Sequence, residues 1–91
     1  MTFYLDTSDY LALDVIKLLN NPARDIIRVR LDKNYDSILL SLYTITGQKI
    51  QELQLSNPSD IVSMNINVTS GLYLLHISNG EKQVVKKVIV Q

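Results

Sequence analysis

The feature that most constrains this chain is a series of short segments in which every second residue is apolar. In the clearest of them, polar residues alternate with Val62, Met64, Ile66 and Val68. A period of two indicates a strand with one buried face, because successive side chains of a strand point to opposite faces. Such strands bury their apolar face against a second sheet or inside a barrel, so the pattern predicts an all-β fold.

Comparable segments recur along the chain, separated by turn-forming residues at spacings of about ten residues. We expect strands near residues 15–19, 27–31, 37–45, 50–55, 62–68, 73–77 and 82–90. For the first segment a helix over residues 11–19, with Ser8 as its N-cap, stays open beside the strand. About seven short strands and no convincing interior helix predict a small immunoglobulin-like antiparallel β-sandwich, with a small barrel as the alternative.

Several local signals set the details of this expected sheet structure. Gly47 and Gly71 are expected in turns, and Asn79-Gly80 favours a hairpin with a type I′ turn. The apolar positions change parity between Ile50 and Leu53, which predicts a β-bulge. The alternation around residues 73–77 places Tyr73 inside, as a core or corner tyrosine.

Composition removes several classes of function. The 91 residues suit one domain, and nine basic against nine acidic side chains remove the usual electrostatic reason for nucleic-acid binding. The chain has no Cys, which excludes disulfides and thiolate sites, and its single His76 is expected to face solvent without an orienting partner. No apolar run approaches the roughly 18 residues of a membrane span. We therefore expect no catalytic, cofactor-binding or metal site, and no enzyme activity.

The charges are unevenly distributed. Residues 1–14 carry three Asp and no base, whereas residues 79–91 carry three Lys and one Glu. Two of these, Lys86 and Lys87, are neighbours in the last expected strand, so one of them should point toward the core side. An inward lysine on an edge strand hinders edge-to-edge aggregation. The alternative is that a partner reads this basic strand.

Four blocks of the sequence, in this order, resemble a known family. They are Asn20-Asn21-Pro22-Ala23-Arg24-Asp25; Tyr43-Thr44-Ile45-Thr46-Gly47-Gln48-Lys49-Ile50; Gly71-Leu72-Tyr73; and Asn79-Gly80 followed by Val85-Lys86-Lys87-Val88-Ile89-Val90. Together they resemble the C-terminal sorting domain of the type IX secretion system of Bacteroidota. The resemblance covers roughly residues 15–91, and it departs from the family at Asn20, where a proline is usual.

This resemblance implies a non-catalytic signal domain that directs an N-terminal cargo domain across the outer membrane. The implied partners are the outer-membrane translocon, a shuttle protein and a sortase-like peptidase that often removes the domain. The cargo would pass through the periplasm and reach the cell surface or the medium, with no cofactor, no nucleic acid and no direct membrane insertion. The fold alone leaves an adhesion or carbohydrate-binding module as the alternative.

The resemblance also divides the chain into a linker, residues 1–14, and a sorting domain, residues 15–91. Since cargo of this family first needs a signal peptide, we expect an excised C-terminal piece with Met1 added and any cleavage before Asn21. The final hairpin, residues 71–91, would offer an edge for strand addition by the machinery. The residues expected to carry sorting or recognition are Asn21, Pro22, Ala23, Asp25, Gly47, Lys49, Gly71, Tyr73, Gly80, Lys86, Lys87, Val88, Ile89 and Val90.

Overall fold

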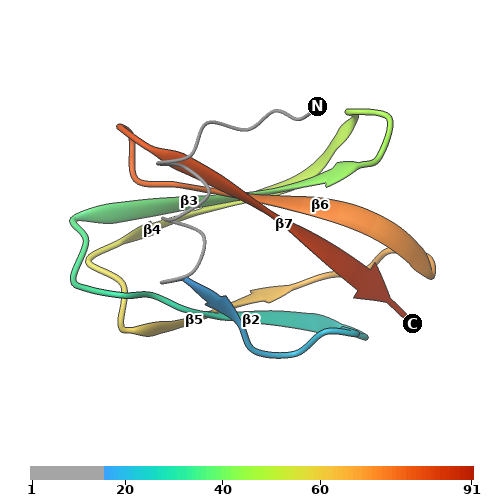
Figure 1. Cartoon of the computed structure of the whole chain (residues 1–91), viewed down its shortest axis with the longest axis horizontal. Helices are drawn as coiled ribbons and strands as arrows, with labels where there is room; N and C mark the ends of the chain where they lie inside the picture. Colours follow the sequence, from blue (N-terminus) through green and yellow to red (C-terminus); the bar gives the residue numbers. More distant parts are fainter. Residues whose placement is uncertain (1–15) are drawn as a thin grey trace.

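The computed structural model describes residues 16–91, which form two antiparallel sheets packed face to face (Figure 1). The strands are β1 (Lys17–Leu18), β2 (Ile26–Arg30), β3 (Ser37–Thr44), β4 (Lys49–Ser56), β5 (Ile61–Asn65), β6 (Gly71–Ser78) and β7 (Gln83–Val90). The smaller sheet has the order β1-β2-β5, and the larger has the order β4-β3-β6-β7. The predicted all-β sandwich is confirmed, and the two separate sheets exclude the barrel.

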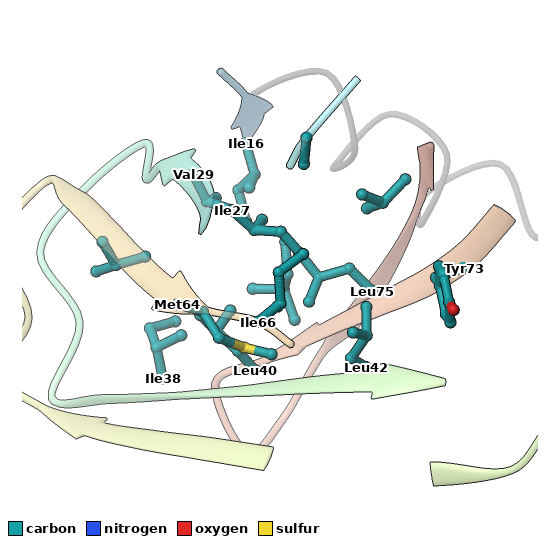
Figure 2. Close-up of a cluster of buried hydrophobic side chains, with 14 of the residues drawn as sticks. Ile16, Ile27, Val29, Ile38, Leu40, Leu42, Met64, Ile66, Tyr73 and Leu75 are labelled. Carbon is teal, nitrogen blue, oxygen red and sulfur yellow. The ribbon is translucent and has the colours of Figure 1, made fainter. Parts of the chain in front are cut away.

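The core lies between the two sheets and follows the alternation of the sequence. In β2, for example, Ile27 and Val29 are fully buried, whereas Arg28 and Arg30 are exposed. Figure 2 shows such side chains from both sheets meeting between the layers, with Tyr73 at one end of the cluster. Burying a large aliphatic side chain contributes roughly 1.5–3 kcal/mol, so this shared core holds the two sheets together.

Two strand details show how pairing shapes the sheets. The register between β3 and β4 shifts at Leu42/Tyr43 and leaves Ile50 as the extra residue, which confirms the predicted bulge. The strand expected over residues 62–68 ends early, at Asn65. Its partner β2 begins only at Ile26, so pairing stops after Ile66 donates its N–H to the carbonyl of Asp25 at 3.0 Å.

The turn between β6 and β7 differs from the expected type I′ turn. The N–H of Asn79 donates to the carbonyl of Lys82 at 3.2 Å, so Gly80 and Glu81 are the central residues. Only Gly80 among these has a positive φ, +97°, which matches a type II′ turn. The turn is moved by one residue because the Asn79 Oδ1 accepts hydrogen bonds from the N–H groups of Glu81 and Lys82, at 2.9 and 2.8 Å.

The other turn expectations have mixed outcomes. Gly47 has a φ of +97° in the β3–β4 connection, where its N–H donates to the carbonyl of Thr44 at 3.0 Å. Gly71, by contrast, is the first residue of β6 rather than part of a turn. The first expected element forms the two-residue strand β1. Most of the helix considered over residues 11–19, and the expected linker over residues 1–14, lie outside the described residues.

Candidate functional site

The Asn21 side chain binds the backbone of the C-terminal strand. Its Nδ2 donates to the carbonyl of Lys87 at 3.3 Å, and its Oδ1 accepts the N–H of Ile89 at 2.9 Å. These two groups lie two residues apart on β7, the spacing at which a neighbouring strand would bind them. The amide of Asn21 therefore takes the place of a strand residue at the edge of the larger sheet.

Ala23 continues this pairing with backbone groups. Its N–H donates to the carbonyl of Ile89 at 2.7 Å, and its carbonyl accepts the N–H of Gln91 at 2.8 Å. The result is an isolated parallel bridge between Ala23 and Val90. In Figure 1 the C-terminal end of β7 reaches toward the layer formed by β2 and β5, where this bridge lies. The first and last blocks of the sequence resemblance are thus joined by hydrogen bonds.

Asn20 makes the matching contact with the smaller sheet. Its Nδ2 donates to the carbonyl of Ile26 at 2.7 Å, and its Oδ1 accepts the N–H of Arg28 at 2.9 Å. Adjacent asparagine side chains therefore bind the edge groups of two different sheets. We call this pair, Asn20 and Asn21, the asparagine clamp.

In the sequence, Asn20 stands out only as a departure from the family's usual proline. A proline side chain has no hydrogen-bonding groups, so it could not bind the backbone of β2. The signal available in the sequence was a pair of asparagines directly before Pro22, which offers two amide side chains at a corner. Nothing in the sequence indicated that the two amides bind different sheets.

Asn21 and Ala23 occupy only one half of the outer edge of β7, the edge that faces away from β6. The carbonyl of Lys87 and the N–H of Ile89 face away from β6, so alternation turns the backbone groups of Gln83 and Val85 to the same edge. From Lys87 onward the edge is occupied by Asn21 and Ala23. Among residues 16–91 the edge groups of Val85 have no backbone partner, and we call this half, as those residues leave it, the open half of the edge.

The two neighbouring lysines point to opposite faces of this strand. Lys86 is half-buried on the inner face, in register with the fully buried Leu75. Lys87 is exposed on the outer face, in register with Leu74. Because β7 is an edge strand, the prediction of one inward lysine on an edge is confirmed.

The third block of the resemblance lies directly beside the clamped half of β7. Gly71 pairs with Val90, and Tyr73 pairs with Val88. The Tyr73 hydroxyl donates to the carbonyl of Thr69 at 2.7 Å, and the residue is 8% exposed. This confirms the prediction of a buried corner tyrosine, because its hydroxyl satisfies a backbone carbonyl just upstream.

Other predicted site residues lie elsewhere. Gly80 is in the turn at the opposite end of β7, and Asp25 is an exposed residue that uses its carbonyl to bind Ile66. Lys49 begins β4, where its ammonium contacts the Glu52 carboxylate at 2.7 Å and lies 6.0 Å from the centre of the Tyr43 ring. The hydrogen bond and the charge of each partner raise the pKa of Lys49 and lower the pKa of Glu52.

The structure therefore gathers only part of the predicted set. The residues brought together at the C-terminal end of β7 are Asn21, Pro22, Ala23, Gly71, Tyr73, Lys87, Val88, Ile89 and Val90. Gly47 and Lys49 sit together at the β3–β4 connection, while Asp25 and Gly80 are separate.

His76 has partners that the sequence did not indicate. Its Nδ1 contacts the side-chain amide of Gln83, and its ring centre lies 4.3 Å from that of Tyr43. Burial lowers the pKa of His76. His76 lies on the outer face of the larger sheet, as predicted, but the expectation that it has no orienting partner is wrong, because Gln83 and Tyr43 from neighbouring strands contact its ring.

A hollow of about 380 Å³ opens where the described chain begins, lined by residues that include Ile16, Tyr35 and Val84. Burial, together with a hydrogen bond to Asp32 and its charge, raises the pKa of Tyr35 to about 12. Among residues 16–91 no three His, Asp or Glu side chains come together as a metal-binding group. The same residues include no helix with the length and apolar character needed to cross a membrane.

Comparison with known proteins connects this architecture to a family. The family model for the secretion system C-terminal sorting domain matches residues 18–91, from β1 through the asparagine clamp to the end of β7. No curated protein matches the sequence. Domains of this family are signals for export to the cell surface or the medium, and as a family they are generally non-catalytic. The chain belongs to the C-terminal sorting domains of the type IX secretion system.

Proposed function

We propose that this domain is a non-catalytic signal that carries an N-terminal cargo domain from the periplasm through the outer-membrane translocon of the type IX system. The family match over residues 18–91 is the observation that supports this proposal. It includes every strand of the sandwich except the first residue of β1, which supports a signal formed by the folded domain rather than by a short peptide.

The export machinery, including its shuttle protein, binds the open half of the β7 edge by strand addition. Strand addition uses exposed backbone groups for affinity and alternate side chains for specificity. Supporting this site is the closure of the other half of the edge by Asn21 and Ala23. A partner strand then pairs along Gln83, Val84 and Val85, a length of roughly 10 Å.

A sortase-like peptidase removes the domain by cutting the chain before Ile16. The support for this boundary is the attachment of the next residues to the sheets, since Ile16 is 6% exposed and β1 pairs with β2. Asn20 and Asn21 then bind both sheets through their side chains. The mass of the exported cargo, measured after its release, gives the cleavage position, and a cut after Ile16 would contradict this proposal.

A secretion assay tests the sorting function. The domain is fused behind a signal peptide and a fluorescent protein in a bacterium with a working type IX system and in a translocon-deficient mutant. Fluorescence outside intact cells, lost in the mutant, is the expected result. Fluorescence retained in the periplasm of both strains would refute the sorting function, and titration with surface glycans would then test the binding-module alternative.

Deleting residues after Val85 cannot test the edge, because it removes the buried Val88 and Val90 and with them the fold. The sharper variant is Val85→Pro, because proline removes an edge-facing N–H and leaves the hydrogen bonds to β6. Its control is Val85→Ile, which keeps both the N–H and an apolar side chain at this exposed position. We expect Val85→Pro alone to lose export while both variants stay folded by circular dichroism. Equal export of the two would refute strand addition at this edge.

A further inference from the structure

The outer faces of the two sheets differ sharply in character. The outer face of the smaller sheet is mostly polar, with Lys17, Arg28, Arg30, Ser63 and Asn65 exposed around two separated apolar residues, Leu19 and Ile61. The outer face of the larger sheet carries Leu72, Val85 and Ile89, whose exposed fractions are 44%, 38% and 48%. A group of exposed apolar side chains on a small domain is typical of a surface that binds a protein, a membrane or a ligand.

These apolar residues are contiguous in the register of the sheet. Leu72 pairs with Ile89 across β6 and β7, and the half-buried Leu74 lies two residues along from Leu72. Val85 lies four residues before Ile89 on the same face of β7. We call the surface formed by Leu72, Leu74, Val85 and Ile89 the β6–β7 apolar face.

One cation lies in the middle of this face. Lys87 is exposed between Val85 and Ile89 and is paired in register with Leu74. The structure shows no carboxylate paired with Lys87 among residues 16–91, whereas Lys49, farther across the sheet, is already neutralised by Glu52. As far as residues 16–91 show, the face therefore combines exposed aliphatic side chains with one positive charge that has no paired carboxylate.

We infer that the β6–β7 apolar face binds a protein segment of the export machinery that presents apolar side chains around a carboxylate. This inference rests on the proposed sorting function and identifies a second surface, distinct from the open edge of β7. Charge complementarity with Lys87 sets the orientation and the partner choice, and the apolar side chains supply most of the affinity.

Two other occupants fit this surface less well. A second copy of the domain packed face to face about a two-fold axis through Lys87 would bring two ammonium groups together, which is unfavourable. An anionic membrane favours clusters of several basic residues, and this face offers one. Both occupants are outcomes of the test below.

The test uses exposed residues, so the variants should keep the fold. Ile89→Ser removes the most exposed apolar side chain of the face, and Ile61→Ser is its control, since Ile61 is a strand isoleucine with 40% exposure on the opposite outer face. Lys87→Glu reverses the central charge, and Lys82→Glu reverses an exposed charge in the β6–β7 turn. Urea midpoints within each pair show whether the variants are equally stable.

The readout is the fraction of the fluorescent fusion found outside cells of the type IX host. We expect Ile89→Ser and Lys87→Glu to lower this fraction at least about tenfold, as loss of a binding hot spot does. Ile61→Ser and Lys82→Glu should stay within about twofold of the parent domain. Tenfold loss with both controls intact supports the inference.

The other outcomes distinguish the two proposals. A parent domain that is never exported overturns the sorting function and this inference with it. If the parent domain and the variants Ile89→Ser and Lys87→Glu are all exported equally well, the inference is overturned and the sorting function stands. If the parent binds phosphatidylglycerol vesicles and Ile89→Ser does not, the face binds a membrane. If the parent forms a dimer in sedimentation velocity and Ile89→Ser does not, the face binds a second copy. Either result would also overturn the inference.

Discussion

Replacing Asn21 with alanine should loosen the C-terminal strand by a predictable amount. The substitution removes the 2.9 Å bond to the N–H of Ile89 and the longer 3.3 Å bond to the carbonyl of Lys87. A neutral hydrogen bond contributes about 1 ± 0.5 kcal/mol net. The longer bond contributes less, so Asn21→Ala should lower the free energy of unfolding by about 1.5 kcal/mol.

Urea denaturation measures this change in stability. For a domain of this size the slope of the free energy with urea is about 1 kcal/mol/M, so the midpoint should fall by about 1.5 M with an unchanged slope. Amide hydrogen exchange locates the effect, because the N–H of Ile89 loses its acceptor and should exchange faster.

Asn20→Ala is the matched control, because it also removes two amide hydrogen bonds, but from β2 instead of β7. It should destabilise the domain to a similar extent, speed the exchange of the Arg28 amide and leave the Ile89 amide protected. Unchanged exchange at Ile89 in Asn21→Ala, or a loss of stability below about 0.3 kcal/mol, would refute the reasoning that the side chain replaces a strand residue.

Two further predictions concern pH and backbone conformation. Because burial holds the folded-state pKa of His76 below the ordinary value of 6.5, the unfolded chain binds more protons as the pH falls below 6.5, so stability should decrease there. The urea midpoint should be lower at pH 5.5 than at pH 7.5, and His76→Gln should reduce that difference; an unchanged difference would contradict the role of His76. Gly47 has a φ of +97° with open space where a Cβ would lie, so Gly47→Ala should cost about 1 kcal/mol of unfolding free energy through backbone strain alone. Calorimetry checks this cost, and an equally stable variant would show that the turn relaxes freely.

What the sequence determined by itself is the local β structure. The alternation of apolar residues predicted which faces of β2, β5 and β6 are buried, and the parity change predicted the bulge at Ile50. The same rule placed the two neighbouring lysines on opposite faces of β7. These features follow from the sequence because the period of a strand and the change of face at a bulge depend on adjacent residues alone.

What only the tertiary structure decided depends on partners far along the chain. Asn21 binds the N–H of Ile89, 68 residues away, and Asn20 binds a different sheet, although the two residues are neighbours. The early end of β5, the half-closed edge of β7 and the partners of His76 likewise follow from which strands pair. Pairing between sheets is selected by the packing of the whole core, so a local pattern shows that a strand has an edge but not what occupies that edge.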